Sequence, residues 1–387
     1  MKHKTLNISI YFAILFCNIM ASNWINDKNA INKNYAFEYN HATYKVFKDS
    51  LYHIVSNTSN ENKSKKGAMI VTVNQKGDLV KTTKLSDTNN FIISGTKLKE
   101  GGFLFVGYNK LNNDDWNKIY VAKTDKNLNI IWTNNYGSDN YENKGYAIIQ
   151  VNEKEYWILG HTKASTNNTL LLKIDDKGKE KWFSYLPNLN CSFASHMIIN
   201  KSKEVIIAGQ NSKQLFVAKI NSNGNIDWSY NYTEDNYIHR LYEIKNTNDG
   251  IIIVGNTMKN LKNKKDILII KLSTNGKEEW VKVLGNQYSE AAYDIENTKN
   301  GNYIISGFAL KDKEGTLYSS FIIKTDQLGN ELSRVDLNKL NSNKIYDIDV
   351  IYNEKIKNNS FIAIGDIINE DKTEILFMQF NELVNFH

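Results

Sequence analysis

A phrase of about fifty residues, repeated along the chain, constrains the fold of this sequence more than any other feature. Its clearest copy runs from Tyr242 to Gly285 and contains four strand-like apolar runs. The runs are joined by turns such as Asn248–Gly250 and Thr274–Lys277, whose Asn, Asp and Gly residues tolerate positive φ and suit tight hairpins. Each copy is therefore expected to form a small antiparallel sheet.

Each copy is marked by a glycine that closes its second strand, with a serine in the first copy. The marks are Ser56, Gly107, Gly160, Gly209, Gly255, Gly307 and Gly365. Second and third strands such as 251–255 and 267–272 are apolar on both faces, so each sheet must be covered on both sides. Sheets stacked around an axis provide that cover, and four-strand repeats of about this length are typical of propellers. The sequence predicts an all-β fold, a seven-bladed β-propeller of four-stranded antiparallel blades.

The N-terminal residues 1–21 are typical of a secretory signal peptide. Lys2 and Lys4 precede an apolar run from Ile8 to Met20, which is short for a membrane span. We expect cleavage near Ala21, a propeller domain over residues 22–387, and no membrane span after cleavage. An uncleaved anchor is the alternative. The protein is expected to be exported, to the periplasm, the cell surface or the medium.

The two ends of the repeat region suggest how the ring would close. The seventh copy leaves only Leu383–His387 for a fourth strand, whereas Tyr35–Tyr39 precedes the first copy as an extra strand candidate. We expect this N-terminal strand to pair into the last blade, because such pairing would remove an open sheet edge.

Charge and cysteine content exclude several classes of protein. The chain carries 48 basic and 42 acidic residues, and Arg240 and Arg334 are its only arginines, so we expect no nucleic-acid partner. Cys17 lies in the predicted signal and Cys191 stands alone after it, so no internal disulfide is expected.

The segment Asp175–Trp182, echoed at 221–228 and 273–280, resembles the tryptophan-docking repeat of quinoprotein-like (PQQ-like) β-propeller proteins, as in secreted bacterial propellers of uncharacterised function. The resemblance implies that four tryptophans pack between adjacent blades: Trp132, Trp182, Trp228 and Trp280. It also implies that a quinoprotein dehydrogenase of this kind would commonly carry adjacent cysteines, and this chain has none. We therefore expect no PQQ and no other cofactor.

Residues suited to catalysis are scattered. Five histidines lie in different copies with no metal-binding spacing, namely His41, His53, His161, His196 and His239. Asp347 and Asp349 fit strand alternation better than an acid/base pair, and nucleophile and phosphate-binding motifs are absent. We expect no metal site and favour a non-enzymatic binding or scaffold module. The alternative is a polysaccharide-active hydrolase or lyase whose site is assembled from several blades.

The irregular loops indicate the binding surface. First-to-second and third-to-fourth turns share one end of each blade, here called the short-turn face, and the other connections share the long-loop face. Variable loops on a rigid scaffold commonly carry function. We expect a monomer whose long-loop face binds a glycan, peptide or protein through Trp116, Tyr141, Glu142, Tyr237, His239, Arg240, Tyr288 and Glu290.

Overall fold

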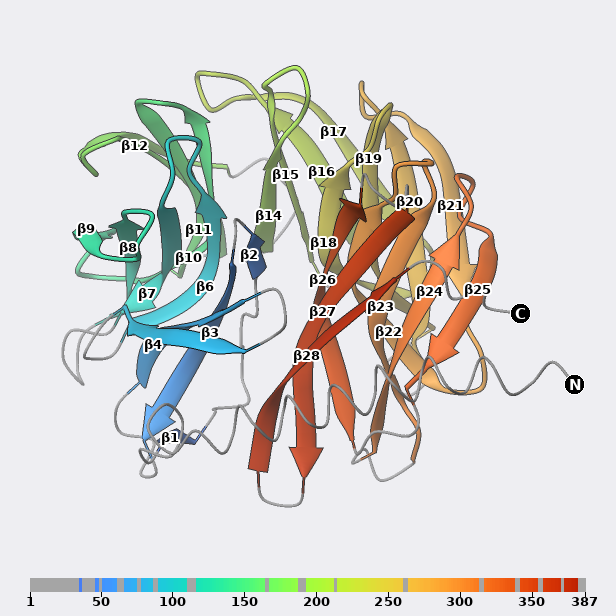
Figure 1. Ribbon diagram of the computed structural model, residues 1–387. Helices are drawn as coiled ribbons and strands as arrows, with labels where there is room; N and C mark the ends of the chain where they lie inside the picture. Colours follow the sequence, from blue (N-terminus) through green and yellow to red (C-terminus); the bar gives the residue numbers. More distant parts are fainter. Residues whose placement is uncertain are drawn as a thin grey trace, which may run out of the picture.

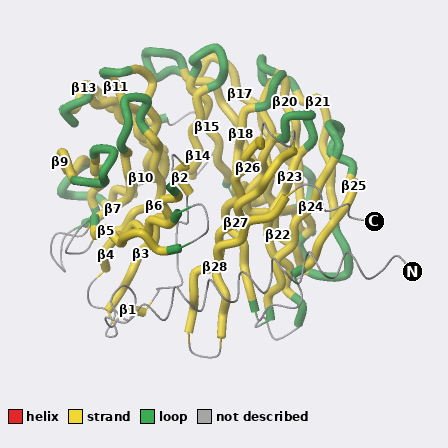
Figure 2. Tube along the Cα trace, viewed as in Figure 1, coloured by secondary structure: helices red, strands yellow, loops and turns green. Residues whose placement is uncertain are grey.

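The chain folds into strands and loops arranged around a central axis (Figures 1 and 2). The computed structural model describes residues 35–36, 46–48, 51–60, 66–74, 78–85, 90–109, 116–163, 167–186, 193–211, 214–259, 264–312, 317–337, 342–353, 358–369 and 372–381. The predicted signal peptide, Cys191 and His41 lie outside these ranges. No helix in the described ranges is long and apolar enough to cross a membrane.

The strands form antiparallel sheets, numbered here 1 to 7 in chain order. Sheet 1 contains β1 (Tyr35–Ala36), β2 (Val46–Lys48), β3 (Tyr52–Asn60), β4 (Lys66–Val73) and β5 (Leu79–Lys84). Sheet 2 contains β6 (Asn90–Lys97), β7 (Phe103–Asn109), β8 (Lys118–Thr124) and β9 (Ile130–Tyr136). Sheet 3 contains β10 (Glu142–Asn152), β11 (Glu155–Lys163), β12 (Asn167–Asp175) and β13 (Glu180–Tyr185).

The remaining sheets repeat this meander. Sheet 4 contains β14 (Phe193–Ile199), β15 (Val205–Gln210), β16 (Gln214–Ile220) and β17 (Ile226–Thr233). Sheet 5 contains β18 (Ile238–Asn246), β19 (Gly250–Met258), β20 (Asp266–Ser273) and β21 (Glu278–Leu284). Sheet 6 contains β22 (Ser289–Asn297), β23 (Tyr303–Leu310), β24 (Tyr318–Thr325) and β25 (Glu331–Asp336). Sheet 7 contains β26 (Asn343–Asn353), β27 (Asn358–Asn369) and β28 (Lys372–Asn381).

This architecture is an all-β β-propeller, as the repeat predicted, but the expected set of seven four-stranded blades is not complete. Sheets 1 to 6 have four or five strands each, whereas sheet 7 has three in the described part of the chain. The described structure therefore has six complete blades rather than seven. The repeat pattern gave the strand order within a blade correctly, but sheet 7 has no fourth strand in the described residues.

The predicted closure of the ring by the N-terminal strand is wrong. β1 pairs with β3 of its own sheet, with Tyr35 opposite Asn60 and Ala36 opposite Ser59. Sheets 1 and 7 meet through side chains instead, in an apolar cluster that joins Tyr52, Ile54, Val71 and Val73 to Ile362 and Ile364. No backbone ladder joins these two sheets in the described residues. Burial of apolar surface provides the contact that strand pairing was expected to provide.

A β-bulge explains the glycine that marks each copy from sheet 2 onward. The inner strand shifts register at one residue, as between Leu241 and Glu243, and the marking glycine lies opposite the residue before the shift. A Cβ on Gly255 would lie 1.9 Å from the carbonyl oxygen of Arg240, and one on Gly107 would lie 1.8 Å from that of Phe91. Glycine is therefore required by close backbone approach at a bulge.

Apolar clusters between neighbouring sheets form the core. One cluster joins Ile206 and Val217 of sheet 4 to Leu241 and Ile253 of sheet 5, and equivalent clusters lie at the other interfaces. Both faces of the central strands are thus buried, which accounts for their continuous apolar runs.

Candidate functional site

The four repeat tryptophans lie between adjacent sheets, as the resemblance implied. Each packs against the positive-φ glycine in the third-to-fourth turn of the next sheet. The pairs are Trp132 with Gly178, Trp182 with Gly224, Trp228 with Gly276, and Trp280 with Gly329. A Cβ on Gly329 would lie 2.7 Å from the ring of Trp280, so the turn can approach the ring only with glycine there.

Each of these tryptophans has a lysine as its cross-strand partner, and each lysine contacts a carboxylate. The strand pairs are Lys123 with Trp132, Lys173 with Trp182, Lys219 with Trp228, and Lys271 with Trp280. The corresponding ion pairs are Lys123–Glu100, Lys173–Glu155, Lys219–Glu204 and Lys271–Asp249. A lysine, an acid and a tryptophan therefore recur at the short-turn end of these four interfaces, from sheets 2 and 3 to sheets 5 and 6.

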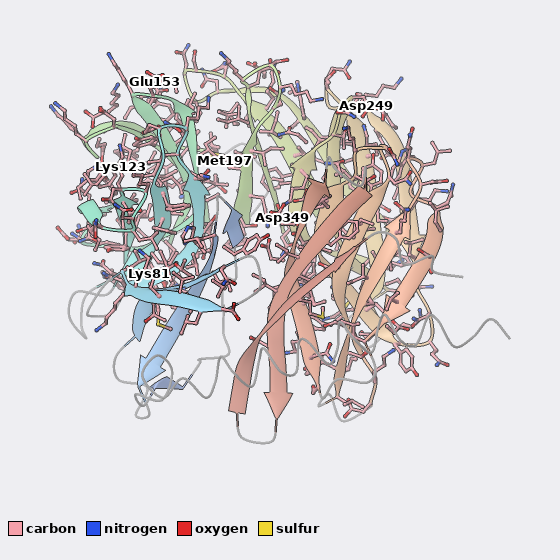
Figure 3. All side chains as sticks on the ribbon, in the orientation of Figure 1. Lys81, Lys123, Glu153, Met197, Asp249 and Asp349 are labelled. Atoms are coloured by element: carbon pink, nitrogen blue, oxygen red, sulfur yellow. The ribbon has the colours of Figure 1, made fainter. Side chains whose placement is uncertain are left out.

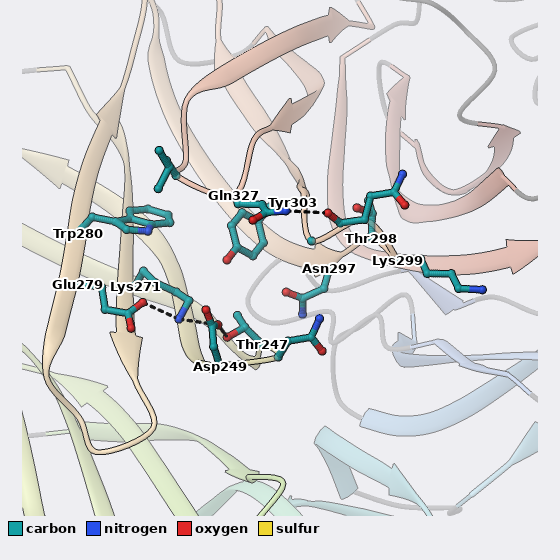
Figure 4. Close-up of a pocket in the computed structure, with 14 residues that line it drawn as sticks. Thr247, Asp249, Lys271, Glu279, Trp280, Asn297, Thr298, Lys299, Tyr303 and Gln327 are labelled. Carbon is teal, nitrogen blue, oxygen red and sulfur yellow. Dashed lines mark hydrogen bonds and ion pairs between the residues drawn. The ribbon is translucent and has the colours of Figure 1, made fainter.

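At the interface of sheets 5 and 6 this unit borders a cavity of about 500 Å³ (Figure 4). Its walls come from the first turns of both sheets, from β20 and β21, and from the third-to-fourth turn of sheet 6. The lining residues are Thr247, Asn248, Asp249, Lys271, Glu279, Trp280, Asn297, Thr298, Lys299, Asn300, Gly301, Tyr303, Gln327 and Leu328. The cavity thus lies on the short-turn face, where Asp249 is labelled in Figure 3.

Lys271 is the buried charge of this cavity. Its side chain is 2% exposed, and its Nζ lies 3.0 Å from both Asp249 Oδ1 and Glu279 Oε2. The hydrogen bond from Lys271 lowers the pKa of Asp249. Because Lys271 is compensated by two carboxylates, its role is to hold Asp249 ionised and to position Glu279 at the cavity wall.

Two polar groups at the cavity have no protein partner. Among the described residues, the indole N–H of Trp280 has no acceptor and the hydroxyl of Tyr303 has no partner. Tyr303 is 4% exposed, and Figure 4 shows its hydroxyl pointing toward Lys271 and Asp249. Burial, together with the charges of Asp249 and Glu279, raises the pKa of Tyr303 to about 12, so the hydroxyl stays protonated and can donate.

A second group of charged residues lies on the inner strands near the axis. Directly after their bulges, three consecutive inner strands carry charged residues two positions apart: Glu243 and Lys245 on β18, Asp294 and Glu296 on β22, Asp347 and Asp349 on β26. Asp349 is labelled near the centre of the ring in Figure 3. These six residues, here called the axial cluster, come together although they are far apart in the sequence.

Contacts in the axial cluster connect sheets 5, 6 and 7. Lys245 Nζ lies 2.5 Å from Glu296 Oε1 and 3.4 Å from Asp294 Oδ1. Asp294 Oδ2 accepts a 2.9 Å hydrogen bond from the backbone N–H of Ile348 in sheet 7. Asp294 therefore connects the last complete blade to the three-stranded sheet.

Burial sets the protonation of this cluster. It raises the pKa of Asp294 to about 7 and also raises that of Glu296, despite the nearby ammonium of Lys245. Burial of Lys245 acts to lower its pKa. The surrounding carboxylates have the larger opposite effect and raise the pKa well above its ordinary value. Within the described residues, no histidine, cysteine, aspartate and glutamate side chains are grouped so that they could hold a metal ion.

The residues predicted for the long-loop face come from the connections around several sheets. Trp116 and Tyr141 are 52% and 42% exposed, and Glu142 accepts a 2.9 Å hydrogen bond from Asn117 and pairs with Lys144 at 2.6 Å. Trp116 lies just before β8 of sheet 2, and Tyr141 and Glu142 lie at the entry to sheet 3. Tyr288 lies under Lys311, whose Nζ is 3.9 Å from the ring centroid, at the entry to sheet 6.

Two of the predicted residues are fully buried rather than presented to solvent. His239 is 0% exposed, packs against Tyr232 and Tyr237, and burial lowers its pKa. Glu290 is also 0% exposed and is bound by Arg334 and Asn286. Tyr237 is half-buried and Arg240 is exposed. Each of the two buried residues is the second residue of an inner strand, β18 or β22. The sequence pattern predicted both in the loops before those strands.

Sequence reasoning missed the cavity and the axial cluster. For the axial cluster, aligning the copies on their marking glycines would have placed the three charged pairs at equivalent positions. For the cavity, Lys271 and Tyr303 belong to different copies, and their proximity follows only from the stacking of sheets 5 and 6.

No family model and no curated protein matches the chain. Its fold is similar to the β-propeller domain of the Trilobed protease from Pyrococcus furiosus, at 11% identity over 90% of this chain and 95% of that chain, with a TM-score of 0.50. It is also similar to the polysaccharide lyase Uly1, at 11% identity over 92% and 94% of the two chains, with a TM-score of 0.51. Identities this low indicate the fold alone.

Proposed function

We propose that this chain is a binding module that takes a neutral, hydroxyl-rich ligand, a glycan, in the cavity between sheets 5 and 6. The observation that carries the proposal is the hydroxyl of Tyr303, which has no partner among the described residues and points into that cavity from an otherwise buried ring. This donor is free to bond a ligand oxygen. The long-loop face remains a separate prediction.

The surrounding groups fit sugar hydroxyls. Asp249 and Glu279 are acceptors held in place by Lys271, and the N–H of Trp280 is a further donor. A hydroxyl can accept from Trp280 or Tyr303 while donating to a carboxylate, whereas a cation or an anion would use only one kind of group. The cavity is lined by two lysines, Lys271 and Lys299, and by two carboxylates, Asp249 and Glu279, so its formal charges balance, which favours a neutral ligand over a charged one.

The test is calorimetric titration with neutral oligosaccharides of several linkages, comparing the parent chain with Tyr303→Phe and Glu279→Gln. We expect each variant to bind about 5- to 10-fold more weakly, since one hydrogen bond contributes on the order of 1 kcal/mol. Tyr156→Phe at the interface of sheets 2 and 3 is the matched control. Unchanged affinity in both cavity variants would contradict the proposal.

A polysaccharide-active hydrolase or lyase is the second candidate, favoured by the axial cluster. A carboxyl group with a pKa of about 7 beside another carboxylate is suited to proton transfer near neutral pH. The expected signature is turnover of a polysaccharide that Asp294→Asn abolishes without weakening binding. Turnover that persists in Asp294→Asn would remove this candidate.

We also propose that sheet 7 acts as the seventh blade and that the chain is exported. β26 has the same bulge as the other inner strands, and Gly365 occupies the marking position opposite it. Secretion of a reporter fused to residues 1–21, and its loss after Lys2 and Lys4 are replaced by Asp, would test export.

A further inference from the structure

Arg240 and Lys265 lie on one face of sheet 5, at the opposite end from the cavity. Arg240 is the cross-strand partner of Asn256, which is the partner of Ile267. Lys265 directly precedes β20, two residues before Ile267, and its backbone is hydrogen-bonded to Ser289 and Glu290 of sheet 6. Ile267 packs in the cluster between sheets 5 and 6. Both cations therefore face sheet 6 at the long-loop end.

Neither cation has a carboxylate partner in the described part of the chain. The adjacent Lys264 differs, because it pairs with Asp266. Glu290 contacts Lys265 only through its backbone N–H, which donates to the Lys265 carbonyl at 2.9 Å, while its carboxylate is bound by Arg334. The connecting segment 260–263 reads Asn, Leu, Lys, Asn and contains no acid.

The fold holds the two like charges together. The Lys265 N–H donates to Ser289 Oγ at 3.2 Å, and with the Glu290 bond this fixes the Lys265 backbone against sheet 6. The Lys265 side chain is half-buried, and burial together with the charge of Arg240 lowers its pKa. Two adjacent cations without a counter-ion repel each other, and such arrangements are concentrated at sites that bind an anion.

We propose that Arg240 and Lys265 form a binding site for the carboxylate of a small acidic ligand. The planar guanidinium of Arg240 matches a carboxylate with two parallel N–H donors, and Lys265 adds a second positive charge beside it. The site lies on the long-loop face, and it is independent of the glycan proposed for the cavity on the short-turn face.

The test is thermal unfolding of the full chain in sodium glucuronate, in inorganic phosphate and in chloride at matched ionic strength. Glucuronate is expected to raise the melting temperature of the parent chain by a few degrees relative to chloride. Arg240→Gln and Lys265→Gln should each lose this shift, whereas the control Lys264→Gln should retain it. Without ligand, both test variants should melt at or above the parent temperature, because the repulsion is removed.

Several results would overturn the assignment. Equal shifts in all variants would mean general screening or binding elsewhere, and the absence of any glucuronate shift would mean no site. A shift with phosphate but not with glucuronate would exclude the carboxylate. If Arg240→Gln does not fold, Lys265→Gln with its Lys264→Gln control decides the question alone.

Discussion

The interface between sheets 2 and 3 is closed, whereas the interface between sheets 5 and 6, built from the same parts, is open. In the closed interface Lys123 Nζ donates to Tyr156 Oη at 2.8 Å, and the indole N–H of Trp132 donates to the carbonyl of Asp176 at 3.2 Å. Asn134 and Tyr136 both donate to the carbonyl of Gly178. The turn of sheet 3 is thereby tied to sheet 2 along its length.

In the open interface the equivalent lysine faces its own sheet. Lys271 is bound by Asp249 and Glu279, and Tyr303, which stands where Tyr156 stands, is left without a partner. The residue before the tryptophan differs, being Glu279 in sheet 5 and the exposed Ile131 in sheet 2. A second acid on its own sheet binds Lys271, which makes no bond to Tyr303, whereas Lys123 bonds Tyr156.

The comparison of the two interfaces predicts the largest change in stability for replacement of the tryptophans. Trp132→Ala should lower the free energy of unfolding by about 4 kcal/mol, because it removes a packed aromatic side chain and a hydrogen bond. Trp280→Ala should lower it by about 1 kcal/mol less, since its N–H is unpaired. Urea denaturation of both variants measures the difference. Equal losses would mean that the two interfaces are equally closed.

A second prediction concerns the dependence of stability on pH. Sheets 5 and 6 carry charged residues of the axial cluster on their inner strands, whereas β10 of sheet 3 has Ala147 and Ile149 at the corresponding positions. The pKa of Asp294 is raised in the fold from 3.8 to about 7, so the folded chain holds this proton more tightly than the unfolded chain. The resulting stabilisation is fully present below about pH 4 and is lost as the pH rises through 7.

Asp294→Asn should therefore flatten the dependence of stability on pH between 5 and 8, by on the order of 2 kcal/mol. Melting temperatures across that range provide the measurement, with Ala147→Ser as a control on the closed side. A parent chain that becomes more stable from pH 5 to 8 would contradict this prediction.

The smallest predicted difference in stability is between variants of the two equivalent tyrosines, Tyr156 and Tyr303. Tyr156→Phe should destabilise the fold by about 1.5 kcal/mol, because it removes the oxygen that accepts from the Lys123 ammonium. Tyr303→Phe should leave stability nearly unchanged, since it removes a hydroxyl that faces the cavity and has no protein partner. Denaturation midpoints of the two variants, measured side by side, test this. A comparable loss in Tyr303→Phe would show that its hydroxyl is satisfied within the protein.

The repeat predicted the propeller because its strands, turns and marking glycines reflect local geometry, such as the bulge opposite Gly255. It did not predict ring closure, because a strand as short as Tyr35–Ala36 carries no pattern that selects its partner. The site was missed for a similar reason. Asp347 and Asp349 were interpreted within one strand, whereas their role depends on Lys245 and Glu296 from neighbouring sheets. Packing between copies is a tertiary property that periodicity within one copy does not encode.

Within the described ranges, sheets 1 and 7 meet through side chains and share no ladder, which has a mechanical consequence. A ring closed by strand exchange opens only when a ladder of hydrogen bonds breaks, and the applied force is distributed over all of those bonds. Here Ile362 and Ile364 rest against Tyr52 and Ile54, so force applied across this contact separates two apolar surfaces and leaves each sheet intact. The ring should open at this seam at low force, and close again without rethreading any strand.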